Sequence, residues 1–467
     1  MKKTAILFLI LLAAILTVSL DRGRGLESVI ADTYVVSHVA VVDVEKGQIH
    51  PDQAVVITGE RIVKVVPQSE ASTPDGGKLI DGKGLYAMPG LVDAHVHYFD
   101  QETFGRLLVA NGVLLVRDMG SPNLLAVGLR KKLNEGEVLG PEMITTGSML
   151  DGDPPYVPSI AFGCKTPEEG REKVRLQAKV GVDQIKLYSR LEEDVFMAIV
   201  DESEKHGLKP VGHVPEAVYV VDAARAGQKS CEHMFGLGKI IAKLLGEPVV
   251  LKSGGMGTDV PYFSRLAEVD REKLHVVLHQ IRDYGMAVCP TIVVMKHGAH
   301  LEEIVAGDYP NLEYVSPMIR DIWKSMWSPD QAGSDLAGEI WPHMQAFVAE
   351  LHKAGVSLLA GTDLLFPGII AGFSLHEEML LWQEAGIPPA DVLRYATILP
   401  TKFVGLDNRL GTVSEGKTAS LVLTRANPLE DIRNASQIEG VFLRGRYLNR
   451  DELDGLLREA KEFCRQE

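Results

Sequence analysis

Residues 89–97 read Pro-Gly-Leu-Val-Asp-Ala-His-Val-His, an apolar run that ends in two histidines. The run predicts a β-strand over Leu91–His97, and because side chains alternate along a strand, His95 and His97 are expected on one face. Two neutral imidazoles that converge in this way are good ligands for zinc and similar ions. The pair alone is a weak signal, since a chain with 14 histidines contains roughly 0.4 such pairs by chance.

Around this run, strand-like and amphipathic helical segments alternate from residue 86 to residue 408. Eight candidate strands occur there: Leu91–His97, Gly112–Asp118, Met143–Gly147, Val182–Tyr188, Pro210–His213, Ser230–His233, Ala287–Val294 and Ser357–Asp363. Eight βα units predict an α/β fold, a (β/α)8 TIM barrel, with the active site at the carboxyl ends of the strands. Two connections are unusually long, about fifty residues after His233 and about sixty after Val294, and we expect them to hold further helices that cover the site.

Four more residues with suitable chemistry fall at or next to the ends of separate predicted strands: Lys186, His213, His233 and Asp363. If these residues had no common function, we would expect them at unrelated positions and not at the ends of four separate strands. In a barrel, all strands end at the same face, so these side chains are expected to converge with the two histidines of the first strand. Their common position favours a metal site.

Lys186 is open to two interpretations. A lysine at a strand end often extends its ammonium group to solvent. An inward lysine between two metal ions can instead react with carbon dioxide, and the carbamate then supplies one oxygen to each ion. The second interpretation predicts a charge-balanced binuclear site with a bridging hydroxide.

Asp363, in Leu-Leu-Ala-Gly-Thr-Asp, is also open to two interpretations. An aspartate after a strand is a common N-cap of the next helix. Beside the histidines, we expect a metal ligand and general base, because such a carboxylate can take a proton from water and pass it to a leaving amine. Metal ions lower the pKa of water from about 15.7 towards about 7 and polarise a carbonyl, so hydrolysis is predicted.

Four further residues near the strand ends have less specific signals. Tyr188 is two residues after Lys186 and shares its direction, so its hydroxyl is a candidate donor to an oxyanion or a substrate carboxylate; simple packing explains it equally well. Cys231 is two residues before His233 and is expected to point the same way. Arg117-Asp118, at the end of the second strand, is predicted to be a structural ion pair, with contact to the substrate as the alternative.

Short β-branched runs separated by turns occur at both ends of the chain, including Gly411–Val413. They predict a small β-sandwich built from both ends. The expected division is residues 1–31 as a signal peptide or N-terminal anchor, 32–85 as the first half of the β-sandwich, 86–408 as the barrel, and 409–467 as the second half of the sandwich with a C-terminal helix.

The first residues have the pattern of a Sec signal. Lys2 and Lys3 precede the apolar run Ala5–Leu20, and a small-residue site follows at Val29-Ile30-Ala31. Export to an extracytoplasmic location, the periplasm or the medium, is therefore predicted. The run is close to the length of a spanning helix, so an uncleaved membrane anchor stays open as the alternative.

The composition excludes several classes of partner. The 467 residues include 48 Lys and Arg against 63 Asp and Glu, a formal net charge of −15, so no nucleic acid partner is expected. The four cysteines, Cys164, Cys231, Cys289 and Cys464, are far apart and form no CxxC pair. A small-molecule substrate is expected, and the composition leaves a homo-oligomer open.

Several motifs together resemble the amidohydrolase superfamily, in the branch with imidazolonepropionase and the metal-dependent Xaa-Pro dipeptidases. These are residues 89–97, Ile-Lys-Leu-Tyr (185–188), Gly-His-Val-Pro (212–215), Glu-His-Met (232–234), Ala-Gly-Thr-Asp (360–363), His376-Glu377-Glu378, Ala396-Thr397 and the run from Gly411 to Lys417. The resemblance implies a distorted TIM barrel with a β-sandwich. It also implies that His95, His97 and Asp363 bind one metal ion, His213 and His233 the other, and carboxylated Lys186 both. The ions of the family are usually zinc.

These observations predict an exported, binuclear metal-dependent amidohydrolase that cleaves an amide bond in a dipeptide or an N-acyl amino acid. Hydrolysis of a cyclic amide, a lactone or another ester by the same site is the alternative. A non-catalytic binding protein is a third possibility, which the loss of a metal ligand would indicate, and all six ligand positions are present.

Overall fold

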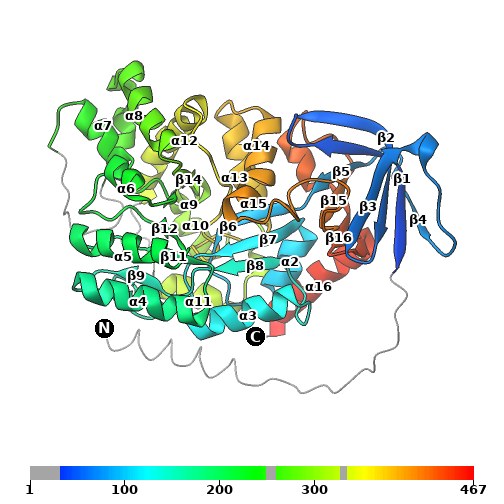
Figure 1. Ribbon diagram of the computed structural model, residues 1–467, viewed down its shortest axis with the longest axis horizontal. Helices are drawn as coiled ribbons and strands as arrows, with labels where there is room; N and C mark the ends of the chain where they lie inside the picture. The colour runs from blue at the N-terminus through cyan, green and yellow to red at the C-terminus, as the bar shows by residue number, and fades with distance from the viewer. Residues whose placement is uncertain (1–31, 249–258, 327–333, 467) are drawn as a thin grey trace.

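The computed structural model describes residues 32–248, 259–326 and 334–466 (Figure 1). The predicted signal segment, residues 1–31, lies outside the described residues. Within the described ranges, no helix is both long enough and apolar enough to span a membrane.

Strands dominate the N-terminal part of the described chain, and strands alternate with helices through its middle. The strands are β1 (Thr33–Asp43), β2 (Gln48–Thr58), β3 (Arg61–Pro67), β4 (Lys78–Asp81), β5 (Tyr86–Pro89), β6 (Leu91–Val96), β7 (Val113–Asp118), β8 (Glu142–Thr145), β9 (Met149–Asp151), β10 (Ala161–Gly163), β11 (Gln184–Leu187), β12 (Lys209–Gly212), β13 (Ser230–Glu232), β14 (Ala287–Cys289), β15 (Leu421–Thr424), β16 (Ile438–Leu443) and β17 (Arg446–Asn449). The α-helices are α2 (Phe104–Ala110), α3 (Asn123–Asn134), α4 (Pro167–Val180), α5 (Glu193–Lys205), α6 (Val220–Ala226), α7 (Gly238–Leu244), α8 (Arg271–Asp283), α9 (Ile292–Gly298), α10 (Leu301–Ala306), α11 (Pro317–Met326), α12 (Ser334–Lys353), α13 (Phe373–Glu384), α14 (Pro389–Tyr395), α15 (Ile398–Val404) and α16 (Arg450–Gln466). Short 3-10 helices are η1 (Gln68–Glu70), η2 (Val260–Glu268), η3 (Leu312–Tyr314) and η5 (Ile432–Ser436).

Strands from both ends of the described chain join one sheet of eight strands. Its order is β17-β16-β15-β5-β1-β2-β3, and β4 pairs with β1. β15 pairs antiparallel with β5, with Val422 opposite Met88, so distant parts of the chain meet here (Figure 1). The predicted strand at Gly411–Val413 is wrong: these residues form a loop. Gly411 has a φ of 88°, and a Cβ atom there would lie 2.3 Å from Oγ1 of Thr401, so the chain turns closely against α15.

The central strands pair in parallel, as β6-β7-β8, β10-β9-β11-β12 and β13-β14. Backbone hydrogen bonds continue between these groups: the Asp183 amide donates to the Thr145 carbonyl (2.9 Å), and the Lys229 amide to the Pro210 carbonyl (2.8 Å). Helices α3, α4 and α5 lie along the outside of these strands (Figure 1). The chain therefore has a TIM-barrel-like α/β fold.

Two of the eight predicted strands differ from the structure. β14 ends at Cys289, because Pro290 has no N–H to continue the ladder, and α9 begins at Ile292. The segment Ser357–Asp363 contains only an isolated parallel bridge, at Leu358. It nevertheless lies beside β14 and β6, since Val288 donates to the Ser357 carbonyl (2.9 Å) and Ala94 to the Ala360 carbonyl (2.8 Å).

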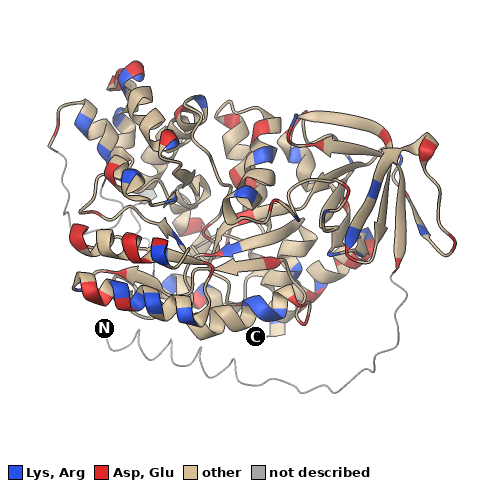
Figure 2. Ribbon diagram, viewed as in Figure 1, with Lys and Arg blue, Asp and Glu red and all other residues tan. Residues whose placement is uncertain are grey.

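The two long connections contain additional helices, as the sequence predicts. The first contains α7, η2 and α8, and the second contains α9 to α12 with η3. Trp323 of α11 donates from its indole N–H to the Leu365 carbonyl (2.9 Å), so the second connection contacts the loop that follows Asp363. On the outer helices α4 and α5, acidic and basic side chains are interspersed (Figure 2).

Candidate functional site

The structure brings the six predicted metal ligands together at the strand ends. His95 is in β6 and His97 directly follows it, Lys186 is in β11, and His213 and His233 directly follow β12 and β13. The rings of His95 and His233 have centroids 4.5 Å apart, and those of His213 and His233 are 5.0 Å apart. Asp363 belongs to the irregular segment beside β6. Its backbone N–H donates a hydrogen bond to the His95 carbonyl (2.8 Å), which places Asp363 next to the histidines.

The Asp363 carboxylate lies among three of these imidazoles. Its Oδ1 is 3.4 Å from Nε2 of both His95 and His97, and its Oδ2 is 4.0 Å from Nδ1 of His233. Ligand atoms of His95, His233 and Asp363 all lie within 4.8 Å of one another. The alternative role of Asp363 as an N-cap does not hold, because the next helix, α13, begins at Phe373.

Lys186 points inward and is only 1% exposed, so it does not extend to solvent. Its Nζ is 3.5 Å from Nε2 of His95. Gly212 makes room for the lysine: a Cβ atom there would lie 2.8 Å from Lys186 Cδ and 2.3 Å from the Leu187 carbonyl oxygen. Burial lowers the pKa of Lys186 to about 8, so the neutral amine is accessible near neutral pH.

Each of the four histidines has a hydrogen-bond partner at Nδ1. The partners are the Glu232 carboxylate for His95 (2.9 Å), the Gly120 carbonyl for His97 (2.9 Å), the Ser189 hydroxyl for His213 (2.8 Å) and the Thr291 hydroxyl for His233 (2.7 Å). A partner at one ring nitrogen orients the ring and leaves the other nitrogen for a metal ion. The donor set of imidazole nitrogens and a carboxylate therefore fits divalent ions of the zinc type.

Burial sets the charge of this cluster except at His97, where burial lowers the pKa but the hydrogen bond and the negative charge of Asp363 outweigh it, so that the net pKa is raised. Burial lowers the pKa of His95 and His213 well below the ordinary range, with Lys186 adding to the effect, and it lowers the pKa of His233 to about 4. For Asp363, burial raises the pKa, but His233 and the other neighbouring histidines outweigh it and the net pKa is lowered. At neutral pH these three imidazoles are neutral and Asp363 is ionised, the states in which both types of side chain bind metal ions.

Backbone geometry turns two of the ligands into the site. His233 and Asp363 both have a φ of 59°, and Thr291, which holds His233, has a φ of 48°. Left-handed conformations cost energy in residues other than glycine and asparagine, and they gather at functional sites. Because the backbone at His233 is left-handed, its side chain does not alternate with that of Glu232, and both side chains lie in the same cluster.

Glu232 is the site residue that the sequence reasoning missed. It is fully buried, and besides His95 it contacts Arg117, whose NH2 lies 2.8 Å from Oε1. The predicted Arg117-Asp118 pair is therefore wrong: Asp118 instead accepts hydrogen bonds from Ser121 and Thr145. The only signal for Glu232 in the sequence was its position directly before His233. Because alternation along a strand places adjacent residues on opposite faces, this position did not predict that both side chains contact the same cluster.

Tyr188 and two cysteines complete the surroundings. The Tyr188 ring stacks on His213, with centroids 4.2 Å apart and an angle of 26°. The Cys231 Sγ lies 3.3 Å from the Phe235 carbonyl oxygen, and Cys289 lies in one cluster with His95 and Glu232. All four cysteines are buried, and no disulfide joins any of them within the described residues.

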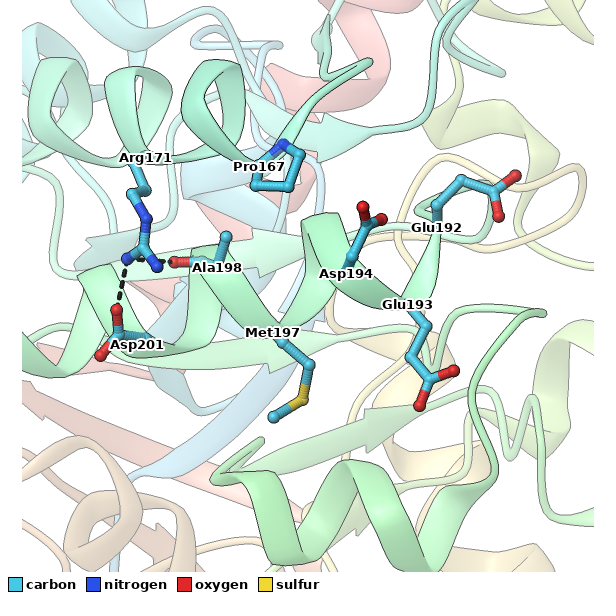
Figure 3. A pocket seen from close by; sticks show the side chains of 8 residues that line it. All are labelled: Pro167, Arg171, Glu192, Glu193, Asp194, Met197, Ala198 and Asp201. Carbon is cyan, nitrogen blue, oxygen red and sulfur yellow. Dashed lines mark hydrogen bonds and ion pairs between the residues drawn. The ribbon is translucent and has the colours of Figure 1, made fainter.

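A separate hollow of about 790 Å³ lies between α4 and α5 (Figure 3). It contains four carboxylates, of Glu192, Glu193, Asp194 and Asp201, and one arginine, Arg171, which pairs with Asp201. None of the predicted site residues lines it. Its acidic lining would repel a substrate carboxylate, so the histidine cluster is the better candidate site.

Comparisons with known proteins agree with this geometry. A sequence model described as the amidohydrolase family matches residues 86–448. Similar solved structures include a protein of Bifidobacterium longum classed provisionally as a prolidase (25% identity, TM-score 0.65, covering 92% of this chain and 99% of that one). Others are a bottromycin amidohydrolase (23%, 0.70, 92% and 90%) and a Xaa-Pro dipeptidase with methionine bound in its active site (20%, 0.65, 90% and 100%). None of the curated proteins matches the chain.

Proposed function

The chain belongs to the amidohydrolase family, and on that premise we propose that it is an exported, binuclear metal-dependent enzyme that cleaves the amide bond of a dipeptide or an N-acyl amino acid. The family membership makes it a hydrolase of amide bonds that acts on small molecules. The observation that carries the finer proposal is the convergence of four imidazoles, Asp363 and a buried lysine at the strand ends.

We assign His95, His97 and Asp363 to one ion and His213 and His233 to the other, with Lys186, as its carbamate, between them. Zinc is the ion that nitrogen and carboxylate ligands of this kind favour. When bound, two such ions supply Lewis acidity that activates water and polarises the scissile carbonyl.

We assign proton transfer and the stabilisation of the oxyanion to side chains of the cluster. The Asp363 carboxylate, held in its ionised form, takes the proton of the attacking water at an oxygen atom and delivers it to the nitrogen of the leaving amine. The hydroxyl of Tyr188, whose ring is fixed by stacking on His213, donates a hydrogen bond to the oxyanion or to the substrate carboxylate. The buried walls of the cluster exclude other water and strengthen these interactions.

A peptide-like substrate is supported by the structural neighbours, one described as a prolidase and one as a Xaa-Pro dipeptidase. We propose that the parallel strands and the segment 357–364 close into a (β/α)8 barrel, and that both chain ends form a separate β-sandwich. Isolated bridges that join Leu358 to β14 and Leu364 to β6 support the closure. The proposed export depends on residues 1–31, and N-terminal sequencing of the mature protein from fractionated cells tests it.

A dipeptide and N-acyl amino acid library, assayed on metal-loaded enzyme, tests the proposed function directly. We expect turnover of a subset of these amides that disappears on chelation and returns with zinc. Cyclic amides, lactones and simple esters belong in the same panel. Turnover confined to those compounds, or binding without turnover of any compound, would contradict the proposal.

A further inference from the structure

A buried arginine links three strands beneath the histidine cluster. Arg117, in β7, is 1% exposed, and its Nε donates to the Ala94 carbonyl of β6 (2.6 Å). Its two terminal nitrogens reach β13: NH1 donates to the Ser230 hydroxyl (3.3 Å), and NH2 donates to both oxygens of Glu232 (2.8 and 3.0 Å). All three guanidinium nitrogens therefore have partners, and the arginine holds Glu232 at a defined place in the interior.

Glu232 in turn uses both of its oxygens as acceptors. Oε1 accepts from Arg117 and from the Ser230 hydroxyl, and Oε2 accepts from Arg117 and lies 2.9 Å from Nδ1 of His95. An ionised carboxylate has no proton to donate. The hydrogen of the neutral His95 ring is therefore on Nδ1, and Nε2, which faces Asp363 and Lys186, carries the lone pair.

His95 differs from the other three histidines in the charge of its partner at Nδ1. The partners of His213 and His233 are hydroxyl groups, which can donate or accept and so do not by themselves select a tautomer. The partner of His97 is a neutral carbonyl. Among the four, only His95 has a carboxylate as its hydrogen-bond partner at Nδ1, and a carboxylate behind an imidazole both selects the tautomer and makes the opposite nitrogen a stronger ligand.

We propose that Glu232 is a positioning residue for His95: held by Arg117, it keeps the Nδ1–H tautomer and directs Nε2 into the metal site. The inference rests on the proposed function, in which His95 is a metal ligand. The acceptor positions of Glu232 are filled by Arg117, Ser230 and His95, so in this proposal Glu232 acts through His95 and not as a ligand.

Three variants test the proposal through metal affinity. Glu232→Gln keeps the shape but places an NH2 group against donors, Glu232→Asp keeps the charge but shortens the reach, and Arg117→Lys keeps the charge but loses the paired bonds. With competing chelator, we expect zinc binding to weaken about 10- to 100-fold in Glu232→Gln, the usual cost of losing a partner behind a metal-binding histidine, and less in Glu232→Asp. Unchanged affinity in all three variants would overturn the proposal.

Glu350→Gln is the matched control. Glu350 lies 2.8 Å from Nε2 of His275, a carboxylate-histidine pair of similar length outside the histidine cluster. It should leave zinc affinity at the wild-type value. If Glu232→Gln only lowered the melting temperature of the metal-free protein and zinc affinity far below that temperature stayed normal, Glu232 would have a purely structural role and the proposal would fail.

A second readout needs neither metal nor a folded Glu232 variant. In metal-free wild-type protein labelled with ¹⁵N-histidine, His95 should give the signals of the Nδ1–H tautomer, with His95→Asn used only to assign them. An Nε2–H tautomer would overturn the proposal. If wild-type protein bound no metal, the proposed function would fail, while this spectrum would still decide whether Glu232 sets the tautomer of His95.

Discussion

The Nζ atom of Lys186 lies 3.5 Å from Nε2 of His95, inside the ring of imidazoles and away from solvent. Gly212, on the neighbouring strand β12, leaves room for the Lys186 side chain, because a Cβ atom at this position would occupy the same space. A buried lysine at the centre of a cluster of proposed metal ligands is costly as a cation, because burial disfavours the charged form. Its conversion to a carbamate would replace the positive charge by a negative one between two ions.

Lys186→Ala tests this role. We expect the variant to lose the second metal ion and most of its activity, because the bridging oxygens are gone. A short carboxylate such as acetate should restore part of both by occupying the gap. Metal content and kcat are measured with and without acetate; turnover equal to wild type would show that no bridge is needed.

Purified wild-type protein should contain about two equivalents of zinc or a similar ion per chain, since two ligand sets are present. Elemental analysis before and after dialysis against chelator measures this. At most one equivalent, even after reconstitution with metal and bicarbonate, would contradict the binuclear assignment.

Asp363→Asn separates proton transfer from structure. The amide cannot accept the proton of water, so kcat should fall by roughly two to four orders of magnitude. Metal content should fall by less than activity, since the other ligands remain, and the melting temperature should stay near wild type. The measurements are kcat and kcat/KM for the best substrate, with metal content on the same sample. An Asn variant that kept more than about a tenth of wild-type kcat would not support a general base at this position.

Gly361→Ala should disturb the site through packing. A Cβ atom at Gly361 would lie 2.6 Å from Sγ of Cys289 and 3.0 Å from Cβ of His95. We expect a loss of about 1 to 3 kcal/mol in the free energy of unfolding, as for other overpacked interiors, together with weaker metal binding. Gly128→Ala is the control: no atom lies within 4 Å of its added Cβ, and alanine in helix α3 should stabilise by about 0.5 to 1 kcal/mol. Denaturant unfolding measures both, and equal effects would contradict the packing argument.

The raised pKa of Glu378 predicts that the free energy of unfolding depends on pH. Burial raises its pKa to about 8 from an ordinary value of 4.5. Between these two pH values the folded protein holds a proton that the unfolded chain has lost, so the stabilisation is complete below pH 4.5 and is lost as the pH rises through 8. Glu378→Gln should remove the part of this slope that comes from Glu378, about one proton, whereas Glu415→Gln at an exposed position should leave the slope unchanged. Urea unfolding of metal-free protein at pH 5 and pH 9 measures the difference; an unchanged slope in Glu378→Gln would assign it to other groups.

Local pattern was sufficient to predict the branch of the family and the six residues that the structure brings together. Period-two alternation placed His95 and His97 on one face, and the shared end of parallel strands placed Lys186, His213 and His233 near them. The match over residues 86–448 and the prolidase and Xaa-Pro dipeptidase neighbours confirm the suspected branch. The roles of the six residues stay predictions.

Tertiary structure alone decided how the cluster is held. Arg117 and Glu232 belong to strands that are distant in sequence, and no periodicity relates them. Alternation also failed at the strand ends: a φ of 59° turns His233 inward beside Glu232, and the same value ends any regular strand at Asp363. The physical reason is that alternation describes a regular pleat, whereas the second partner of each imidazole depends on hydrogen bonds between segments that only the folded chain brings within 3 Å of one another.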